Sequence, residues 1–541
     1  WGVGGGGGGG VHVGWCSWYE FYEDITEGKI EDNAERLKGS NLRPETIVVD
    51  DGYMTQWGDW ESLKPGFEDM KRMASTIKAK GFKPGLWIAP FAADKGSELA
   101  KDHPDWIIRT KNGKPSNSGN CAKFFYGLDA TNPEVIEHAR AAVKRAVEWG
   151  YEVLKLDFLY ASCLTGVRHA SNASRADAYN LAVSALRDAA GPDVFLIGCG
   201  APTIASVGYF DGMRVSADTG PTWKPELPMP WWDQANLPCV RSMVRNSVSR
   251  AGMSHRFWIN DPDCLLLRES TKLSTAEVIS TVSVVGMTSG MLLLSDDMGT
   301  VSASRARLVE QIVPCTDTPA IVMDAHTRTM PRIMRLVCSD VEGSGSQRGT
   351  VQVAKGLGTW SVVSLSNWSD KKARVGVPLD ALKVDGDGKH GFHTFNVWTN
   401  RYKYQAGGEG TRFSCALASH QTEILVVKPV VPDKAGYIGS TFHFTSGFEV
   451  SSVTTTSSDE FHGSIKLEFK SGHSKSEGCA FFFLPHQWEE GTRDDAVILH
   501  INNRATKGEN LKNAAHVSGG TVFAVKCGLE ADKINVLDII W

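Results

Sequence analysis

The sequence predicts an α/β fold, namely a (β/α)8 TIM barrel followed by antiparallel β-sandwich modules. Short apolar segments rich in β-branched residues alternate with segments of helical periodicity from residue 11 to residue 297. This alternation indicates a parallel sheet. Several of the apolar segments end in aspartate, tryptophan or cysteine, as expected where the carboxyl ends of barrel strands form one functional face. After about Pro331 short β runs replace the helical periodicity, which indicates a separate all-β region.

Eight strands account for the predicted barrel. They are expected at residues 11–18, 46–51, 84–90, 151–157, 194–199, 212–218, 256–261 and 290–297. Helices are expected at 24–37, 67–80, 133–149, 175–190 and 235–251. Eight strands in this length fit a closed barrel better than an open sheet, and no G-x-G-x-x-G follows the first strand, which argues against a dinucleotide fold. The segment 93–126, rich in Lys, Asn and Gly, is expected to form an irregular lid over the strand ends.

The chain is predicted to divide into four segments, because 541 residues exceed the size of one ordinary domain. Residues 1–10 include seven consecutive glycines and are expected to be a linker or an artefact. Residues 11–330 are expected to form the catalytic barrel, residues 331–430 a β-sandwich domain and residues 436–541 an additional β-rich module.

Composition excludes several classes of protein. A net charge of -5 provides no broad basic surface, so nucleic acid is not an expected partner. No apolar run reaches the roughly 18 residues that a membrane span needs, and no secretory signal is recognisable. A soluble protein is therefore expected, in a compartment that the sequence leaves undecided. The eleven cysteines contain no C-x-x-C pair and the fifteen histidines show no ligand spacing, so neither a metal nor a cofactor is expected, while one or two disulfides stay open.

Carboxylates at the ends of different strands are the main candidates for chemistry. The reactive side chains at the strand ends are Asp50, Asp51, Trp87, Asp157, Cys199 and Asp218. In a barrel these groups converge on one pocket at the carboxyl face. Two aspartates on different strands, with aromatic residues and no metal motif, are the groups that glycoside hydrolysis requires. One carboxylate attacks the anomeric carbon and the other protonates the departing oxygen.

Two cations accompany the candidate catalytic aspartates. Lys155 lies two residues before Asp157, on the same strand face, and is expected to lower the pKa of Asp157 and keep it ionised. Asp218 is expected to lie in a less solvated setting near another carboxylate, which would keep it protonated near neutral pH. Arg214 lies four residues before Asp218 and faces the same way. Ionised Asp50 and Asp51 suit the capture of sugar hydroxyls.

Structural roles are the alternatives for several of these residues. Asp50 and Asp51 together can cap a helix after the strand, and Cys199 can be a small buried hydrophobic residue. Arg214 can brace Asp218 without contacting sugar. Residues 260–263 are expected to build a strand-end turn rather than to touch substrate.

Eight motifs resemble, in order along the barrel, a known family of enzymes. They occupy residues 14–19, 50–53 with 58–60, 85–91, 103–106, 155–159, 198–202, 211–219 and 260–268. These residues resemble those of clan D glycoside hydrolases, specifically the family 36 α-galactosidases and their raffinose-synthase relatives. The resemblance covers the whole predicted barrel.

The resemblance implies a retaining exo-α-galactosidase that removes terminal α-linked galactose from oligosaccharides or glycoconjugates. It implies that Asp157 is the nucleophile and Asp218 the general acid/base of a double displacement, and that Asp50 and Asp51 hold the galactose 4- and 6-hydroxyls. The other pocket residues that it implies are Trp18, Trp87, Lys155, Cys199 and Arg214. Family members usually carry a β-sandwich domain before the barrel, where residues 1–10 stand here. A pocket completed by a neighbouring subunit, and hence a homo-oligomer, is therefore retained as an alternative.

Three other functions stay open at this point. Interception of the covalent intermediate by a sugar hydroxyl would give a raffinose-synthase-like α-galactosyltransferase. An α-N-acetylgalactosaminidase would differ in the space around the sugar 2-position, near Cys199 and Gly200. A catalytically silent sugar-binding protein is disfavoured, because a silent relative would be free to lose Asp157 or Asp218.

Overall fold

The computed structural model describes residues 13–119, 124–226, 237–386, 388–457, 462–470, 476–485, 498–502, 504–506, 511–517, 520–530 and 534–541. The glycine-rich residues 1–10, predicted to be a linker or artefact, lie outside this part. Contacts divide the chain into two compact units. The first comprises residues 1–246, 253–271 and 290–301, and the second comprises residues 247–252, 272–289 and 302–541.

The first unit is built on a parallel sheet. In the described residues this sheet has nine strands in the order β10-β11-β1-β2-β3-β6-β7-β8-β9, and its neighbouring strands pair in parallel. The strands are β1 (Val13–Cys16), β2 (Thr46–Val49), β3 (Lys83–Ile88), β6 (Val153–Leu156), β7 (Phe195–Gly198), β8 (Gly212–Arg214), β9 (Ile259–Asp261), β10 (Cys264–Leu265) and β11 (Leu292–Leu294). All eight predicted barrel strands are therefore present, and β10 directly follows the seventh.

The two ends of this strand order are tied together. Only Pro262 and Asp263 separate β9 from β10, which are the outer strands of the sheet. The backbone N–H of Met291, just before β11, donates to the carbonyl of Asn260 in β9 at 2.8 Å. The sheet thus curls round on itself, and the predicted (β/α)8 barrel is confirmed.

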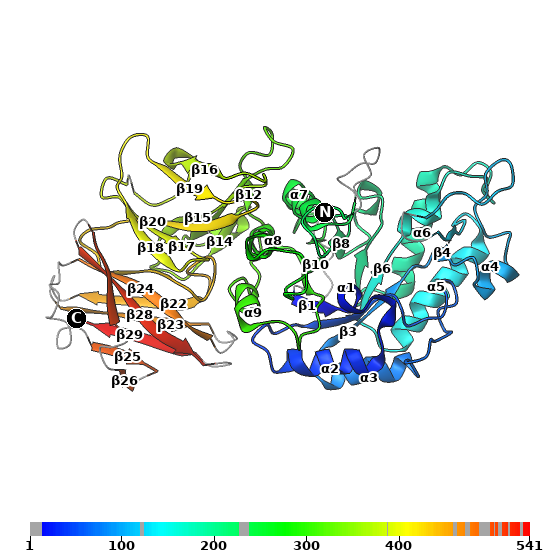
Figure 1. Ribbon diagram of the computed structural model, residues 1–541, viewed down its shortest axis with the longest axis horizontal. Helices are drawn as coiled ribbons and strands as arrows, with labels where there is room; N and C mark the ends of the chain where they lie inside the picture. Colours follow the sequence, from blue (N-terminus) through cyan, green and yellow to red (C-terminus); the bar gives the residue numbers. More distant parts are fainter. Residues whose placement is uncertain are drawn as a thin grey trace. The chain divides into compact units, whose positions relative to one another are not determined.

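Most of the described helices begin at a residue whose side chain caps the helix. The helices are α1 (Trp18–Phe21), α2 (Glu27–Lys38), α3 (Met70–Ala79), α4 (Glu98–Asp102), α5 (Pro133–Glu148), α6 (Arg175–Ala190), α7 (Val240–Arg250), α8 (Thr275–Thr288) and α9 (Ala303–Glu310). Asp69 caps α3, and Ser174 forms a capping box with Asp177 at the start of α6. Figure 1 shows α2, α3, α5 and α6 outside the barrel strands, and α3 and α5 contact β3. Of the predicted helix 235–251, residues 235 and 236 lie outside the described part.

The predicted lid at residues 93–126 is partly regular. Strand β4 (Ala92–Ala93) pairs antiparallel with β5 (Tyr126–Gly127), and α4 lies between them in the sequence. Residues 120–123 of this segment lie outside the described part.

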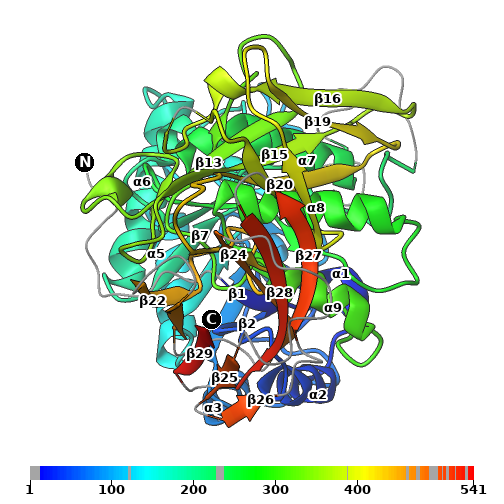
Figure 2. The same cartoon turned by 90° about the vertical axis from the view of Figure 1, so that its left-hand side faces the viewer.

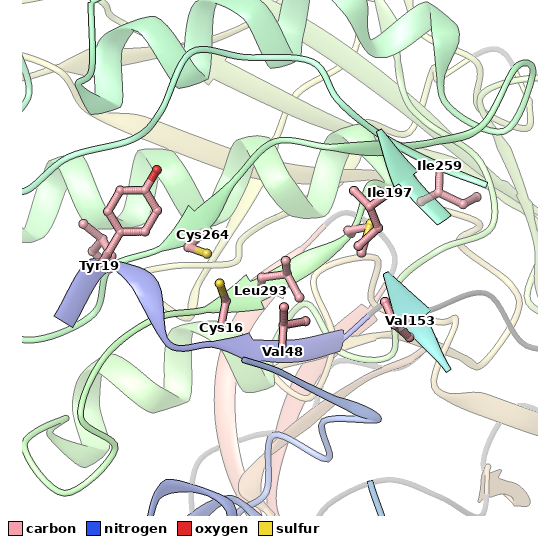
Figure 3. Close-up of a cluster of buried hydrophobic side chains, with 10 residues drawn as sticks. Cys16, Tyr19, Val48, Val153, Ile197, Ile259, Cys264 and Leu293 are labelled. Atoms are coloured by element: carbon pink, nitrogen blue, oxygen red, sulfur yellow. The ribbon is translucent and has the colours of Figure 1, made fainter. Parts of the chain in front are cut away.

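The interior of the barrel is packed with side chains rather than open. A cluster of buried residues joins strands from all round the barrel (Figure 3). Its members are Cys16, Tyr19, Val48, Val153, Ile197, Ile259, Cys264, Leu266, Met291 and Leu293. Burial of these apolar side chains stabilises the barrel and fixes the direction in which each strand end points.

The second unit is dominated by antiparallel sheets, as predicted for the region after Pro331. One sheet has the order β12-β13-β15-β20-β17-β18, with β14 paired to β13, and a second consists of β16 and β19. The strands are β12 (Ile321–Val322), β13 (Ile333–Ser339), β14 (Thr350–Gln352), β15 (Thr359–Ser366), β16 (Ala373–Pro378), β17 (Phe392–Asn396), β18 (Arg401–Gln405), β19 (Arg412–Leu417) and β20 (Thr422–Pro429). Buried side chains from both sheets, including Val363, Phe392 and Phe413, pack into one core.

The remaining strands of the second unit form two further sheets in the described residues, in the orders β21-β24-β28-β27 and β22-β23-β29-β25-β26. The strands are β21 (Gly436–Ser440), β22 (Val450–Ser457), β23 (Gly463–Phe469), β24 (Ser476–Leu484), β25 (Ile498–Ile501), β26 (Arg504–Thr506), β27 (Leu511–Val517), β28 (Gly520–Leu529) and β29 (Asn535–Ile540). Figure 2 shows β24, β28 and β27 side by side. The division of the chain into the four segments named above stays a prediction.

Of the eleven cysteines, the ten in the described residues form no disulfide with one another, and Cys121 lies outside that part. In the same part of the chain, no helix is long and apolar enough to cross a membrane.

Candidate active site

The predicted site residues meet at a cavity of about 610 Å³ at the carboxyl ends of the barrel strands. All of them except Cys199 line it: Trp18, Asp50, Asp51, Trp87, Lys155, Asp157, Arg214 and Asp218. Cys199 is buried and does not line the cavity. Its Sγ accepts a long hydrogen bond of 3.6 Å from Nη1 of Arg214. A direct contact between Cys199 and sugar therefore stays a prediction.

Asp50 is held in place by a buried ion pair. Its Oδ2 accepts from Nζ of Lys155 at 2.7 Å and from Sγ of Cys16 at 3.2 Å, and its Oδ1 accepts from the backbone N–H of Asp51 at 2.9 Å. Burial lowers the pKa of Lys155 and the Asp50 charge raises it, and the net pKa lies well above its ordinary value. Lys155 is therefore a fixed cation that orients Asp50. Asp51 is oriented separately, because its Oδ1 accepts from the indole N–H of Trp57 at 3.0 Å.

Loss of the Lys155 ammonium is expected to destabilise the fold by about 3–5 kcal/mol, because it leaves the Asp50 carboxylate buried without its cation. The exposed fractions of the two side chains are only 6% and 3%. Urea unfolding of Lys155→Met measures the loss. The matched control is Lys80→Met, whose 2.7 Å ion pair with Glu35 lies at the surface and is expected to contribute less than about 1 kcal/mol. Equal losses in the two variants would contradict the prediction.

Asp157 follows β6 and is held by two donors from the protein. Nε1 of Trp87 donates to its Oδ2 at 3.1 Å, and the backbone N–H of Phe158 donates to its Oδ1 at 2.6 Å. Phe158 has a left-handed backbone with φ 49°, and Gly200 lies against it with φ 53°. A Cβ on Gly200 would lie 3.0 Å from the Phe158 backbone and 3.1 Å from Oδ1 of Asp157. A side chain at position 200 would therefore crowd Asp157 and strain the backbone, and glycine avoids both.

The pKa of Asp157 is shifted in the direction opposite to the one expected from sequence. Burial raises this pKa. The Lys155 charge and the hydrogen bonds from Phe158 and Trp87 lower it, but the net pKa lies above the ordinary aspartate value. The Asp218 charge also raises it. Lys155 does lower the pKa of Asp157, as expected, but burial raises this pKa by more, so the net shift is upward.

Asp218 lies at the rim of the cavity and is paired with Arg214. Nη2 of Arg214 donates to Oδ1 of Asp218 at 2.8 Å and also lies 3.0 Å from Oδ2 of Asp263. The exposed fraction of the side chain is 52% for Asp218 and 4% for Arg214. The expectation of a less solvated setting for Asp218 was therefore wrong. This carboxyl is open to solvent because it lies beyond the end of β8.

Several residues at the site were not identified from the sequence. Trp57, Phe158 and Phe125 form an aromatic cluster with Trp87, with ring centroids 5.0–6.4 Å apart. Tyr19 lines the cavity and its hydroxyl donates to Asp263. Tyr19 and Asp263 both lie inside motifs singled out in the sequence. Their pairing had no local signal, because 244 residues separate them.

The chain is similar to several α-galactosidases. Residues 13–186 match the family model described as Melibiase. A bifunctional alpha-galactosidase/sucrose kinase, AgaSK, of Mediterraneibacter gnavus is 32% identical over 113 residues, which are 19% of this chain and 12% of that protein. An A type blood alpha-D-galactosamine galactosaminidase of Flavonifractor plautii is 26% identical over 210 residues, which are 35% of this chain and 19% of that protein. The chain thus spans less than a fifth of the length of these two curated relatives.

Among solved structures, the chain is similar to TtGalA, an alpha-galactosidase from Thermus thermophilus determined in complex with stachyose. The identity is 33% and the TM-score 0.51, over 57% of this chain and 66% of that one. The fold, the matched family model and these similarities together relate the chain to the α-galactosidase class of glycoside hydrolases.

Proposed function

We propose that this protein is a retaining exo-α-galactosidase of glycoside hydrolase family 36. In this proposal Asp157 attacks the anomeric carbon of a terminal α-galactoside, and Asp218 protonates the leaving oxygen and then activates water. Asp50 and Asp51 accept hydrogen bonds from the sugar hydroxyls, and Trp18 and Trp87 line the sugar. The observation that carries the proposal is that two carboxyls, one hydrogen-bonded to Trp87 and one paired with Arg214, line the same cavity as the oriented pair Asp50 and Asp51.

The two carboxyls have environments suited to different roles. Asp157 is fixed by two donors, so its attacking oxygens are held in position before substrate binds. Asp218 is in contact with solvent, which suits a group that must exchange protons with water. The similarity to an alpha-galactosidase solved with stachyose supports an α-galactoside as substrate.

The test is release of nitrophenol from p-nitrophenyl α-galactoside, with the β-galactoside as the stereochemical control. The proposal expects turnover of the α-anomer alone, and proton NMR of the first product should detect α-galactose, because two displacements retain the configuration. β-Galactose as the first product would contradict the retaining mechanism. Incubation with sucrose as acceptor separates hydrolysis from a raffinose-synthase-like transfer, because transfer gives an oligosaccharide in place of free galactose.

A second candidate substrate carries a nitrogen at the sugar 2-position. The match to an A type blood alpha-D-galactosamine galactosaminidase extends over 210 residues and favours this candidate. The p-nitrophenyl α-galactosaminide and α-N-acetylgalactosaminide therefore belong in the same assay. Faster turnover of either than of the α-galactoside would replace the main proposal.

The acid limb of the pH profile of kcat/KM is expected above the ordinary aspartate range, since Asp157 must be ionised to attack and its pKa is raised. Trp87→Phe removes an N–H donor that stabilises the charged form. The pKa of Asp157 should then rise further, and the acid limb should move up by about one pH unit.

The control for that shift is Trp60→Phe. Trp60 packs against Trp87 with ring centroids 6.2 Å apart, and its buried indole nitrogen has no hydrogen-bond partner within the described residues. This variant should leave the acid limb in place. A similar shift in both variants would mean that packing, not the hydrogen bond, sets the pKa of Asp157.

A further inference from the structure

Asp263, a buried carboxyl residue, is joined to the proposed acid/base by two routes. Its Oδ2 forms an ion pair with Arg214, 3.0 Å from the Nη2 that also donates to Asp218. The same Oδ2 accepts at 2.8 Å from the backbone N–H of Thr219, the residue that follows Asp218. Asp263 thus fixes both the cation beside Asp218 and the main chain that carries it.

The turn that carries Asp263 is itself tightly defined. Asp263 lies between β9 and β10 with φ 83°, a left-handed conformation that a residue other than glycine adopts only at a cost. Its backbone N–H donates to Oδ1 of Asp261 at 2.8 Å, and its Oδ2 accepts a second hydrogen bond, from the Tyr19 hydroxyl. The exposed fraction of the Asp263 side chain is 2%. A buried carboxyl with these partners is held at a fixed position.

We propose that Asp263 is a positioning residue for Asp218, an inference that rests on the proposed function. It neutralises Arg214, so that Asp218 faces a balanced ion pair instead of a bare guanidinium. An unbalanced cation 2.8 Å from Asp218 would favour the ionised carboxylate and weaken it as a proton donor. With Asp263 in place, Arg214 orients Asp218 while its charge is shared between two carboxyl groups.

Arg214 is the cation in direct contact with Asp218. The other titratable or charged groups that interact with Asp218, Asp263 or their neighbours are Tyr19, Tyr22, Lys155, Asp157, Cys199, Asp261 and Cys264. Lys155 is paired with Asp50 at 2.7 Å. Burial raises the pKa of Tyr19 and of Cys199 well above their ordinary values, so both are neutral at physiological pH.

The test is Asp263→Asn, which keeps the shape of the side chain and removes its charge. Arg214 then acts on Asp218 alone, and the basic limb of kcat/KM, which reports the acid group, should move to lower pH by about one unit or more. The loss of activity should also be larger for a poor leaving group, such as the sugar of melibiose, than for nitrophenolate. An unchanged basic limb, or equal losses on both substrates, would overturn the proposal.

A matched control separates this effect from simple destabilisation. Arg268 and Asp296 form another buried ion pair in the same barrel unit, with 2.9 Å between Nη1 and Oδ1. Asp296→Asn should lower Tm as Asp263→Asn does, but leave the basic limb at its wild-type pH. If Asp263→Asn fails to fold, Tyr19→Phe is the second variant. It removes one hydrogen-bond donor from Asp263, so the Asp263 carboxyl should interact more strongly with Arg214. The basic limb should then move to higher pH. No upward movement in that variant would also overturn the proposal.

A readout independent of turnover distinguishes failure of this inference from failure of the proposed function. The carboxyl of Asp218 can be titrated by NMR in protein labelled at aspartate Cγ and assigned with Asp218→Asn. A lower pKa of Asp218 in Asp263→Asn supports the positioning role even if no glycoside is hydrolysed. An unchanged pKa in a folded variant contradicts it even if the wild type is an active α-galactosidase.

Discussion

Asp157→Ala is expected to lower kcat/KM for p-nitrophenyl α-galactoside by about 10⁴-fold or more, because no other group can form the covalent intermediate. Nitrophenolate leaves without protonation, so the loss isolates the attacking group from the acid. The carboxylate of Asp157 is aimed by the Trp87 and Phe158 donors, which remain in the variant. Removal of the carboxylate leaves a small space beside the position of the anomeric carbon, and a small external anion fits into this space.

Azide should therefore restore part of the activity of Asp157→Ala and yield β-galactosyl azide. A single displacement of an α-galactoside inverts the configuration, so the anomer of the product identifies the group that was removed. Asp188→Ala is the matched control, since Asp188 is exposed on α6 and pairs with Arg140 at 3.5 Å. It should retain wild-type kcat/KM. Full activity of Asp157→Ala, or α-galactosyl azide as its product, would exclude Asp157 as the nucleophile.

The barrel could be predicted from sequence because its signals are local. Each strand is a short apolar run, and the helices between them begin at caps such as Asp69 and Ser174. The site could also be predicted in outline. The topology of parallel strands brings residues at the carboxyl ends together whatever their separation in the chain, and this places Asp50, Asp157 and Asp218 around one cavity.

The pairing of charges within the site could not be predicted, because it depends on distances across the barrel. Strand periodicity placed Lys155 beside Asp157, yet its Nζ binds Asp50, 105 residues away. Once Lys155 is engaged there, burial decides the direction of the Asp157 pKa shift. Arg214 was correctly expected to lie beside Asp218. Its second partner, Asp263, could not be found from a local pattern, because it depends on the turn that joins β9 to β10.

The role of Asp218 is best tested by the leaving group. Asp218→Ala should lower kcat/KM for melibiose by about 10²–10⁴-fold, because the departing sugar oxygen then leaves without a proton. For p-nitrophenyl α-galactoside the first step needs little acid assistance, so the loss in kcat/KM should be much smaller. The second step should become limiting, because no base activates water, and kcat should therefore fall more than kcat/KM.

Azide again distinguishes the two carboxyls. In Asp218→Ala it attacks the covalent intermediate without needing a base, so it should raise kcat and give α-galactosyl azide, the anomer opposite to that from Asp157→Ala. Folding of the variant is checked by Tm, since Arg214 keeps its second carboxylate, Asp263, at 3.0 Å and is not left as an unpaired buried charge. Equal losses on melibiose and on the nitrophenyl substrate would rule out Asp218 as the proton donor. Asp218 would then serve only as an ion-pair partner of Arg214, and another group at the rim of the cavity would be the proton donor.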